Sequence, residues 1–169
     1  MRKAENRVGQ IFNGWLVLDY INNKIMTVQN VETGTVKTGM RLSNILAGSI
    51  KDYNQKSVCG VGFIGEGKHV PSVNGKLSKE FALWRGMIKR CYGGSKFYAD
   101  VEVCERWHCF QNFADDLPSL PNYAEWLNAD GERWELDKDG LSQSRTYSPE
   151  TCQFLTQAEN LAIRNSKAH

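Results

Sequence analysis

The stretch RWELDKDGLSQSRTYSPETCQFLTQAENLAIR, from Arg133 to Arg164, decides the fold of the C-terminal half of the chain. Within it, Thr156-Gln157-Ala158-Glu159 has the spacing of a capping box, in which the threonine and glutamate side chains satisfy free N–H groups at the start of a helix. The pattern predicts a strand over 133–139, a loop over 140–150, a second strand over 152–155 and a helix that ends at Arg164. This order of strand, loop, strand and helix defines a ββα unit.

Residues 8–50 alternate short apolar runs with turn dipeptides. Asn13-Gly14, Asn22-Asn23 and Thr33-Gly34 separate the runs, and these residue types favour tight turns. Three or four short antiparallel strands are expected. Residues 1–57 are therefore assigned to a small antiparallel β subdomain at the N-terminus.

A Gly- and Lys-rich stretch over 58–77 is expected to join the two halves. Four glycines lie within residues 60–67, but no helix follows them and the Gly-Lys-Ser/Thr ending of a phosphate-binding P-loop is missing. A strand and a loop are the favoured interpretation. A contact with phosphate stays open as the alternative.

The clearest helical pattern covers residues 78–92, with Ser78 as the candidate N-cap. Its apolar face holds Trp84, Met87, Ile88 and Cys91. Another face holds Arg85, Lys89 and Arg90. A basic helix face suits a DNA backbone, and a row of solvated charges is the alternative.

A second helix is predicted from Glu105 to Leu117, and Pro118 and Pro121 end it. Residues 78–169 are therefore assigned to one helical domain that includes the ββα unit. Together with the N-terminal strands, this gives an α+β fold.

The composition is that of a globular chain. It has 169 residues, of which 41% are hydrophobic and 24% charged, and these values exclude a chain disordered throughout. No apolar run approaches the roughly 20 residues that span a bilayer, and the charged N-terminus lacks the apolar segment of a secretory signal. Five cysteines without a CxxC pair favour a reduced, cytoplasmic protein with buried thiols.

The net charge of +2 is unevenly distributed. Residues 1–79 hold 11 Lys and Arg against 5 Asp and Glu, whereas residues 114–150 hold 3 against 9. A polyanion-binding surface beside a metal-binding one would have this distribution. Ordinary solvated charge is the alternative, and charge alone favours it.

Several motifs are combined between about residue 58 and residue 165. They are GVGF at 60–63, WRGMIKRCY at 84–92, VEVCERW at 101–107 with Phe110 and Phe113, ELDKD at 135–139, and YSPETCQF at 147–154 with Asn160. In this combination the chain resembles bacteriophage proteins of the HNH-endonuclease group, which includes relatives of homing endonucleases. The resemblance implies a phage-encoded DNA-binding protein in the host cytoplasm, with no membrane partner.

The HNH pattern implies a site in the ββα unit. In that pattern the first strand ends in an acidic residue and a histidine, and the helix supplies an Asn or His to the same divalent metal. Carried over, the candidate catalytic residues are Asp137, Lys138 at the histidine position, and Asn160. Asp137 and Asp139 would share a strand face and bind Mg²⁺ or Mn²⁺ together with Asn160. Alternatively, Asp139 begins a turn and Asp137 pairs with Arg133 or Lys138.

The lysine at position 138 departs from the HNH pattern. Because a lysine is protonated near pH 7 unless strongly desolvated, Lys138 would be a poor general base, but it could hold a phosphate. The three histidines, His69, His108 and His169, all lie outside the unit. Metal-dependent hydrolysis of DNA and an inactive scaffold that binds DNA or inhibits a host or defence protein both stay open, and a structural virion component is a third option.

If the chain binds DNA, four cations are the candidate contacts with backbone phosphates: Arg85, Lys89 and Arg90 of the basic helix face, and Arg106. The cysteines at 91, 104, 109 and 152 fit no standard zinc spacing, so structural zinc is not expected. Trp84 and Trp107 are expected in the core, whereas Trp126 and Trp134 are candidates for stacking on bases.

Overall fold

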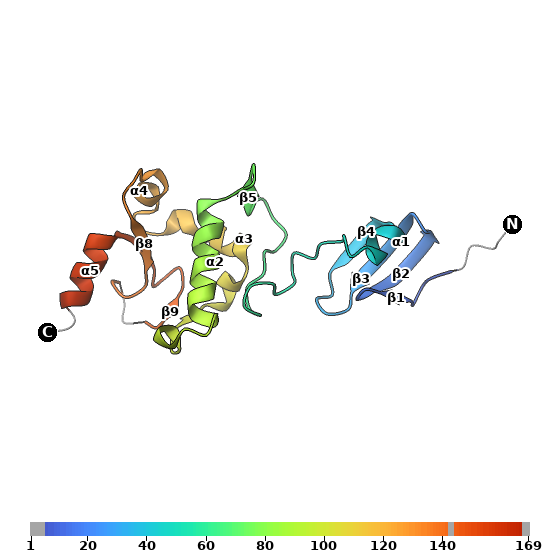
Figure 1. Ribbon diagram of the computed structural model, residues 1–169, viewed down its shortest axis with the longest axis horizontal. Helices are drawn as coiled ribbons and strands as arrows, with labels where there is room; N and C mark the ends of the chain where they lie inside the picture. Colours follow the sequence, from blue (N-terminus) through green and yellow to red (C-terminus); the bar gives the residue numbers. More distant parts are fainter. Residues whose placement is uncertain (1–5, 142–143, 167–169) are drawn as a thin grey trace. The chain divides into compact units, whose positions relative to one another are not determined.

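The computed structural model describes residues 6–141 and 144–166. The chain divides between Gln55 and Lys56 into two compact units (Figure 1). Each unit has its own hydrophobic cluster. Helices and strands are mixed, which confirms the α+β class. In the part of the chain that the structure describes, no helix has both the length and the apolar character needed to cross a membrane.

The first unit is a four-stranded antiparallel sheet followed by a short helix. The strands lie in chain order and are β1 (Ile11–Phe12), β2 (Trp15–Asn22), β3 (Ile25–Asn30) and β4 (Val36–Met40), and the helix is α1 (Leu42–Leu46). Asn13 and Gly14 join β1 to β2 with φ angles of 48° and 79°, the left-handed pair that a two-residue hairpin requires. The expected antiparallel strands are thus confirmed.

The second unit contains the remaining elements. In chain order they are β5 (Ser72–Val73), β6 (Lys76–Leu77), α2 (Lys79–Tyr92), η1 (Lys96–Tyr98), β7 (Glu102–Val103), η2 (Glu105–His108), α3 (Phe110–Asp116), η3 (Leu117–Ser119), α4 (Tyr123–Asn128), β8 (Trp134–Asp137), β9 (Thr146–Tyr147), β10 (Gln153–Thr156) and α5 (Gln157–Ser166). Residues 58–77, expected as a joint between the halves, fall within this unit.

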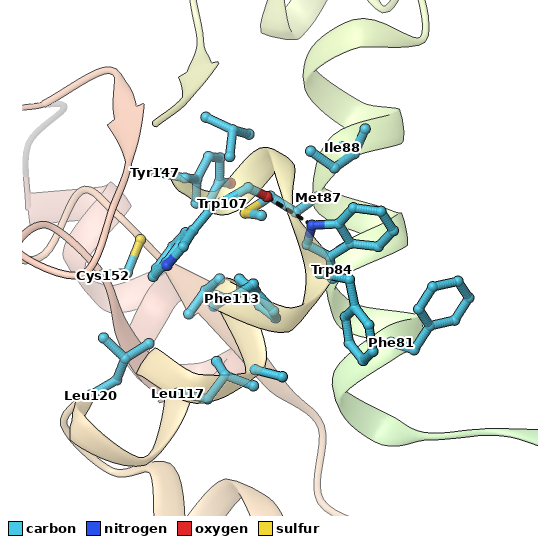
Figure 2. Packing of buried hydrophobic residues seen from close by; sticks show 14 of the residues in the cluster. Phe81, Trp84, Met87, Ile88, Trp107, Phe113, Leu117, Leu120, Tyr147 and Cys152 are labelled. Atoms are coloured by element: carbon cyan, nitrogen blue, oxygen red, sulfur yellow. Dashed lines mark hydrogen bonds between the residues drawn. The ribbon is translucent and has the colours of Figure 1, made fainter. Parts of the chain in front are cut away.

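Helix α2 organises the core of the second unit (Figure 2). The Ser78 hydroxyl accepts a hydrogen bond from the Phe81 amide at 3.2 Å, which confirms the predicted N-cap. Trp84, Met87 and Ile88 are fully buried, as their helical spacing indicates. The indole nitrogen of Trp84 donates a hydrogen bond to the Trp107 carbonyl at 2.8 Å and so ties α2 to η2.

The helix expected over 105–117 is interrupted, and this part of the prediction is wrong. Helix η2 ends at His108, Cys109 is extended, and α3 begins at Phe110. The interruption arises because the backbone here pairs with Phe63: the Phe63 amide donates to the His108 carbonyl, and the Phe110 amide donates to the Phe63 carbonyl, each at 2.9 Å. The Gly-rich stretch is therefore packed against the helical core.

A close approach explains one of these glycines. A Cβ atom on Gly62 would lie 3.0 Å from the indole ring of Trp84. A larger residue would have to displace this buried ring, because protein interiors are close-packed.

Strands β8 and β10 pair antiparallel, with Asp137 opposite Gln153, and α5 follows β10 directly. The Glu159 amide donates to the Thr156 hydroxyl at 3.3 Å, and the Glu159 carboxylate accepts from the Thr156 amide at 2.9 Å. The capping box is thus confirmed, and the predicted order of strand, loop, strand and helix is present. The loop includes a short strand, β9, that pairs parallel with β7.

Candidate functional site

The predicted site residues of β8 and α5 lie at the contact between these two elements. Glu135 and Asp137 alternate with the core residue Leu136, so they share the other face of β8. The Asn160 amide on α5 donates a hydrogen bond to Glu135 Oε2 at 2.6 Å. Sequence reasoning missed Glu135, although the two-residue period of a strand pairs it with Asp137.

Asp137 is buried and shapes the turn that follows β8. Its Oδ2 accepts a hydrogen bond from the Gly140 amide at 2.6 Å. A Cβ atom on Gly140 would lie 2.7 Å from this oxygen and 3.4 Å from Ile163 on α5, so the turn packs directly under the helix. Asp137 therefore acts as the cap of a tight turn, as aspartate side chains often do.

The strand predicted through Asp139 ends at Asp137, and Asp139 lies in the turn. The two carboxylates therefore do not share a strand face, and that prediction is wrong because the turn capped by Asp137 starts two residues earlier. Lys138 Nζ pairs with Asp139 Oδ1 at 2.6 Å, and the ammonium lies 5.8 Å from the centre of the Tyr147 ring. Only 9% of the Lys138 side chain is exposed.

These contacts bear on the expected divalent metal. Asp137 is bonded to a backbone amide, Asp139 is paired with Lys138, and Asn160 turns its amide nitrogen toward Glu135. Among the described residues, no group of three or more His, Cys, Asp and Glu side chains is placed to hold a metal ion. Asp137, Asp139 and Asn160 are thus each engaged in a contact of their own, and the divalent metal stays a prediction.

The four predicted DNA contacts separate into different environments. Arg85 and Lys89 are exposed on α2. Arg90 is half-buried and lies near Tyr147; burial of this tyrosine raises its pKa, and the nearby Arg90 charge opposes that rise.

Arg106 is engaged with Asp116 on α3. The two side chains form a two-point contact, with Nε to Oδ2 at 2.7 Å and Nη2 to Oδ1 at 2.9 Å. This bond to Arg106 lowers the pKa of Asp116. The guanidinium is thus already used within the fold.

Four cations surround a hollow of about 580 Å³ that sequence reasoning did not find. This basic hollow is lined by the cations Lys96, Lys138, Arg145 and Arg164, the acids Asp100 and Asp139, and the apolar residues Phe97, Val101 and Ile163, among others. Arg145 pairs with Asp100 at 2.6 Å, as Lys138 does with Asp139. The lining thus carries two more cations than acids. No spacing in the sequence signals this gathering, because three separate segments supply it.

The cysteines and tryptophans behave mostly as core residues. Cys152 is buried, and this burial raises the pKa of its thiol to about 12. Trp84 and Trp107 are fully buried, as expected. Trp126, a candidate for base stacking, is instead buried and stacks on Phe154 with ring centres 4.5 Å apart.

Comparisons of the chain with models of known protein families, with curated proteins and with solved structures find no match.

Proposed function

We propose that the second unit binds the phosphate backbone of DNA on a ββα scaffold that resembles HNH endonucleases. The observation that carries this proposal is the excess of cations in the basic hollow. Cations that converge on one concave surface attract polyanions and release the counterions of the DNA on binding. The hollow borders the ββα unit, since Lys138 follows β8 and Arg164 lies on α5.

Binding fits the chemistry of the unit better than cutting does. A general base needs a lone pair that can accept a proton, whereas the residue at the histidine position is a lysine whose ammonium forms an ion pair. Among the described histidines, His69 contacts Asp115 and His108 contacts the Val103 carbonyl, so both are engaged outside the unit. Lys138 is better suited to hold a phosphate.

A direct binding measurement tests the proposal. Fluorescence anisotropy with a labelled blunt DNA duplex should show binding that weakens steeply as salt is raised. If the protein instead bound a host protein with an affinity that does not depend on salt, and had no affinity for DNA, the result would favour an inhibitor. For a phage-encoded protein, either role would be carried out in the cytoplasm of the host cell.

Metal-dependent hydrolysis of DNA is the second candidate function. It is favoured by one observation: Glu135 of β8 accepts a hydrogen bond from Asn160 of α5 and shares its strand face with a second carboxylate, Asp137. Supercoiled plasmid incubated with Mg²⁺, Mn²⁺ or EDTA is scored for nicked and linear forms. Nicking that requires the metal and disappears in Glu135→Gln/Asn160→Ala would favour a nuclease; salt-sensitive binding without nicking under any of these conditions would favour the binding protein.

A further inference from the structure

Phe97 has an unusual environment for a phenylalanine. The residue is 95% exposed, the highest exposed fraction of any large hydrophobic residue in the described chain, and it lines the basic hollow. An exposed phenyl ring contributes none of the favourable free energy that burying its apolar surface would supply. A flat aromatic surface next to cations is the arrangement that single-strand-binding proteins use for stacking a base.

The surroundings of Phe97 supply both parts of a nucleotide site. Val101 and Ile163 are half-buried and give the hollow apolar walls. In the described chain, Lys96 and Arg164 have no ion-pair partner, unlike the two other cations of the lining. The volume of about 580 Å³ falls within the roughly 300–1,000 Å³ of small-ligand sites.

We propose that the basic hollow binds an unpaired nucleotide, with the base stacked on Phe97 and the phosphates held by Lys96 and Arg164. This inference rests on the proposed function, because it names the substrate class of the same site. A base inside a duplex is stacked on both faces, so only a base at a strand end, in a single strand or flipped out of the helix can stack on a side chain.

The charge of the lining favours a nucleotide over a protein partner. A protein that covered Phe97 would also have to cover the charged side chains around it, and charged residues are depleted in the centres of protein interfaces. A nucleotide has an uncharged aromatic part and an anionic part, and both match this lining.

The test compares three DNA ligands by fluorescence anisotropy or competition: a blunt duplex, the same duplex with a single-stranded overhang, and a short oligothymidylate. Wild-type protein should bind the overhang and the oligothymidylate more tightly than the blunt duplex. Phe97→Ala should weaken binding to the two unpaired ligands by roughly 5- to 150-fold, the effect of losing one stacked base, and change blunt-duplex binding by less than about twofold. Phe97→Trp should retain the preference.

Leu77→Ala is the matched control, because Leu77 is 51% exposed and does not line the hollow. It should leave all three affinities unchanged. Competition by thymidine monophosphate identifies the source of the nucleotide. If the monophosphate binds as tightly as the oligothymidylate, the site takes a free nucleotide; if it competes much more weakly than the oligothymidylate, the site takes a nucleotide of a DNA strand. Both results support an unpaired nucleotide.

The outcomes separate this inference from the proposed function. If wild-type protein binds blunt duplex with the expected salt dependence but shows no preference for unpaired DNA, the inference is overturned and the proposed function stands. The inference is likewise overturned, and the proposed function kept, if Phe97→Ala leaves binding to oligothymidylate within about twofold of wild type. If the protein binds none of the DNA ligands, both are overturned.

Discussion

Removing Lys96 and Arg164 should change the salt dependence of DNA binding by a predictable amount. In the described structure these two cations of the basic hollow have no ion-pair partner, whereas the other two are each paired with an acid. Each phosphate that a cation neutralises in duplex DNA contributes about −0.9 to the slope of log K against log salt. The two unpaired cations thus predict a slope of about −1.8, and all four would give about −3.6.

These slopes correspond to large changes in affinity. Between about 50 and about 200 mM salt, a slope of about −1.8 weakens binding about 12-fold, and a slope of about −3.6 weakens it about 150-fold. The double variant Lys96→Ala/Arg164→Ala should make the slope shallower by about 1.8. Fluorescence anisotropy with a blunt duplex at several salt concentrations measures the slope for each protein.

A matched variant separates local contacts from the overall charge. Lys24→Ala/Lys76→Ala removes the same number of exposed cations from positions outside the hollow. It should change the affinity slightly and leave the slope close to that of wild type. An equal change of slope in both double variants would refute the reasoning, because the binding would then depend on net charge and not on the hollow.

The remaining predictions concern folding. Thr156→Ala should lower the free energy of unfolding of the second unit by about 1 kcal/mol, since it removes the cap of α5, and thermal unfolding followed by circular dichroism measures this loss. Trp84→Phe leaves the buried Trp107 carbonyl without its indole partner, which should lower the free energy of unfolding by about 1–3 kcal/mol in addition to the loss from poorer packing. Urea unfolding measures this change, and Trp134→Phe is the control at a half-buried tryptophan. Folding lowers the pKa of Asp116, so ionised Asp116 stabilises the folded state at pH values above its unfolded pKa, and this stabilisation is lost as the pH falls through its folded pKa. The stability lost on acidification, measured by urea unfolding at several pH values, should therefore be smaller in Arg106→Gln than in wild type.

The elements predicted correctly depend on interactions between residues close in the chain. The capping box joins Thr156 to Glu159, and the first hairpin needs only the left-handed pair Asn13 and Gly14. The interruption at Cys109 was not predictable in this way. It depends on backbone pairing with Phe63, which lies 46 residues earlier, and residues 105–117 have a helical pattern of their own.

The candidate site likewise has one feature with a local signal in the sequence and one that depends on tertiary packing. Asp139 was wrongly placed on the strand, although the sequence offers a local signal: an aspartate three residues before a glycine, as Asp137 is before Gly140, favours a side-chain-capped turn. The basic hollow had no such signal. Its cations come from three segments, namely η1, the residues between β8 and β9, and helix α5, and only the packing of the second unit brings them together.

The ion pair of Lys138 connects this turn to the proposed function. The Asp137 cap fixes the turn, and the turn directs the Lys138 ammonium over Tyr147 and against Asp139. A cation with only 9% of its side chain exposed requires a compensating anion, which Asp139 supplies. Under the proposed function, a DNA phosphate would compete with half-exposed Asp139 for this ammonium, and Lys138 would add to the slope expected from Lys96 and Arg164 only where the phosphate displaces Asp139. A histidine at this position could accept a proton, whereas the Lys138 ammonium can only donate hydrogen bonds, which suits the proposed contact with a phosphate.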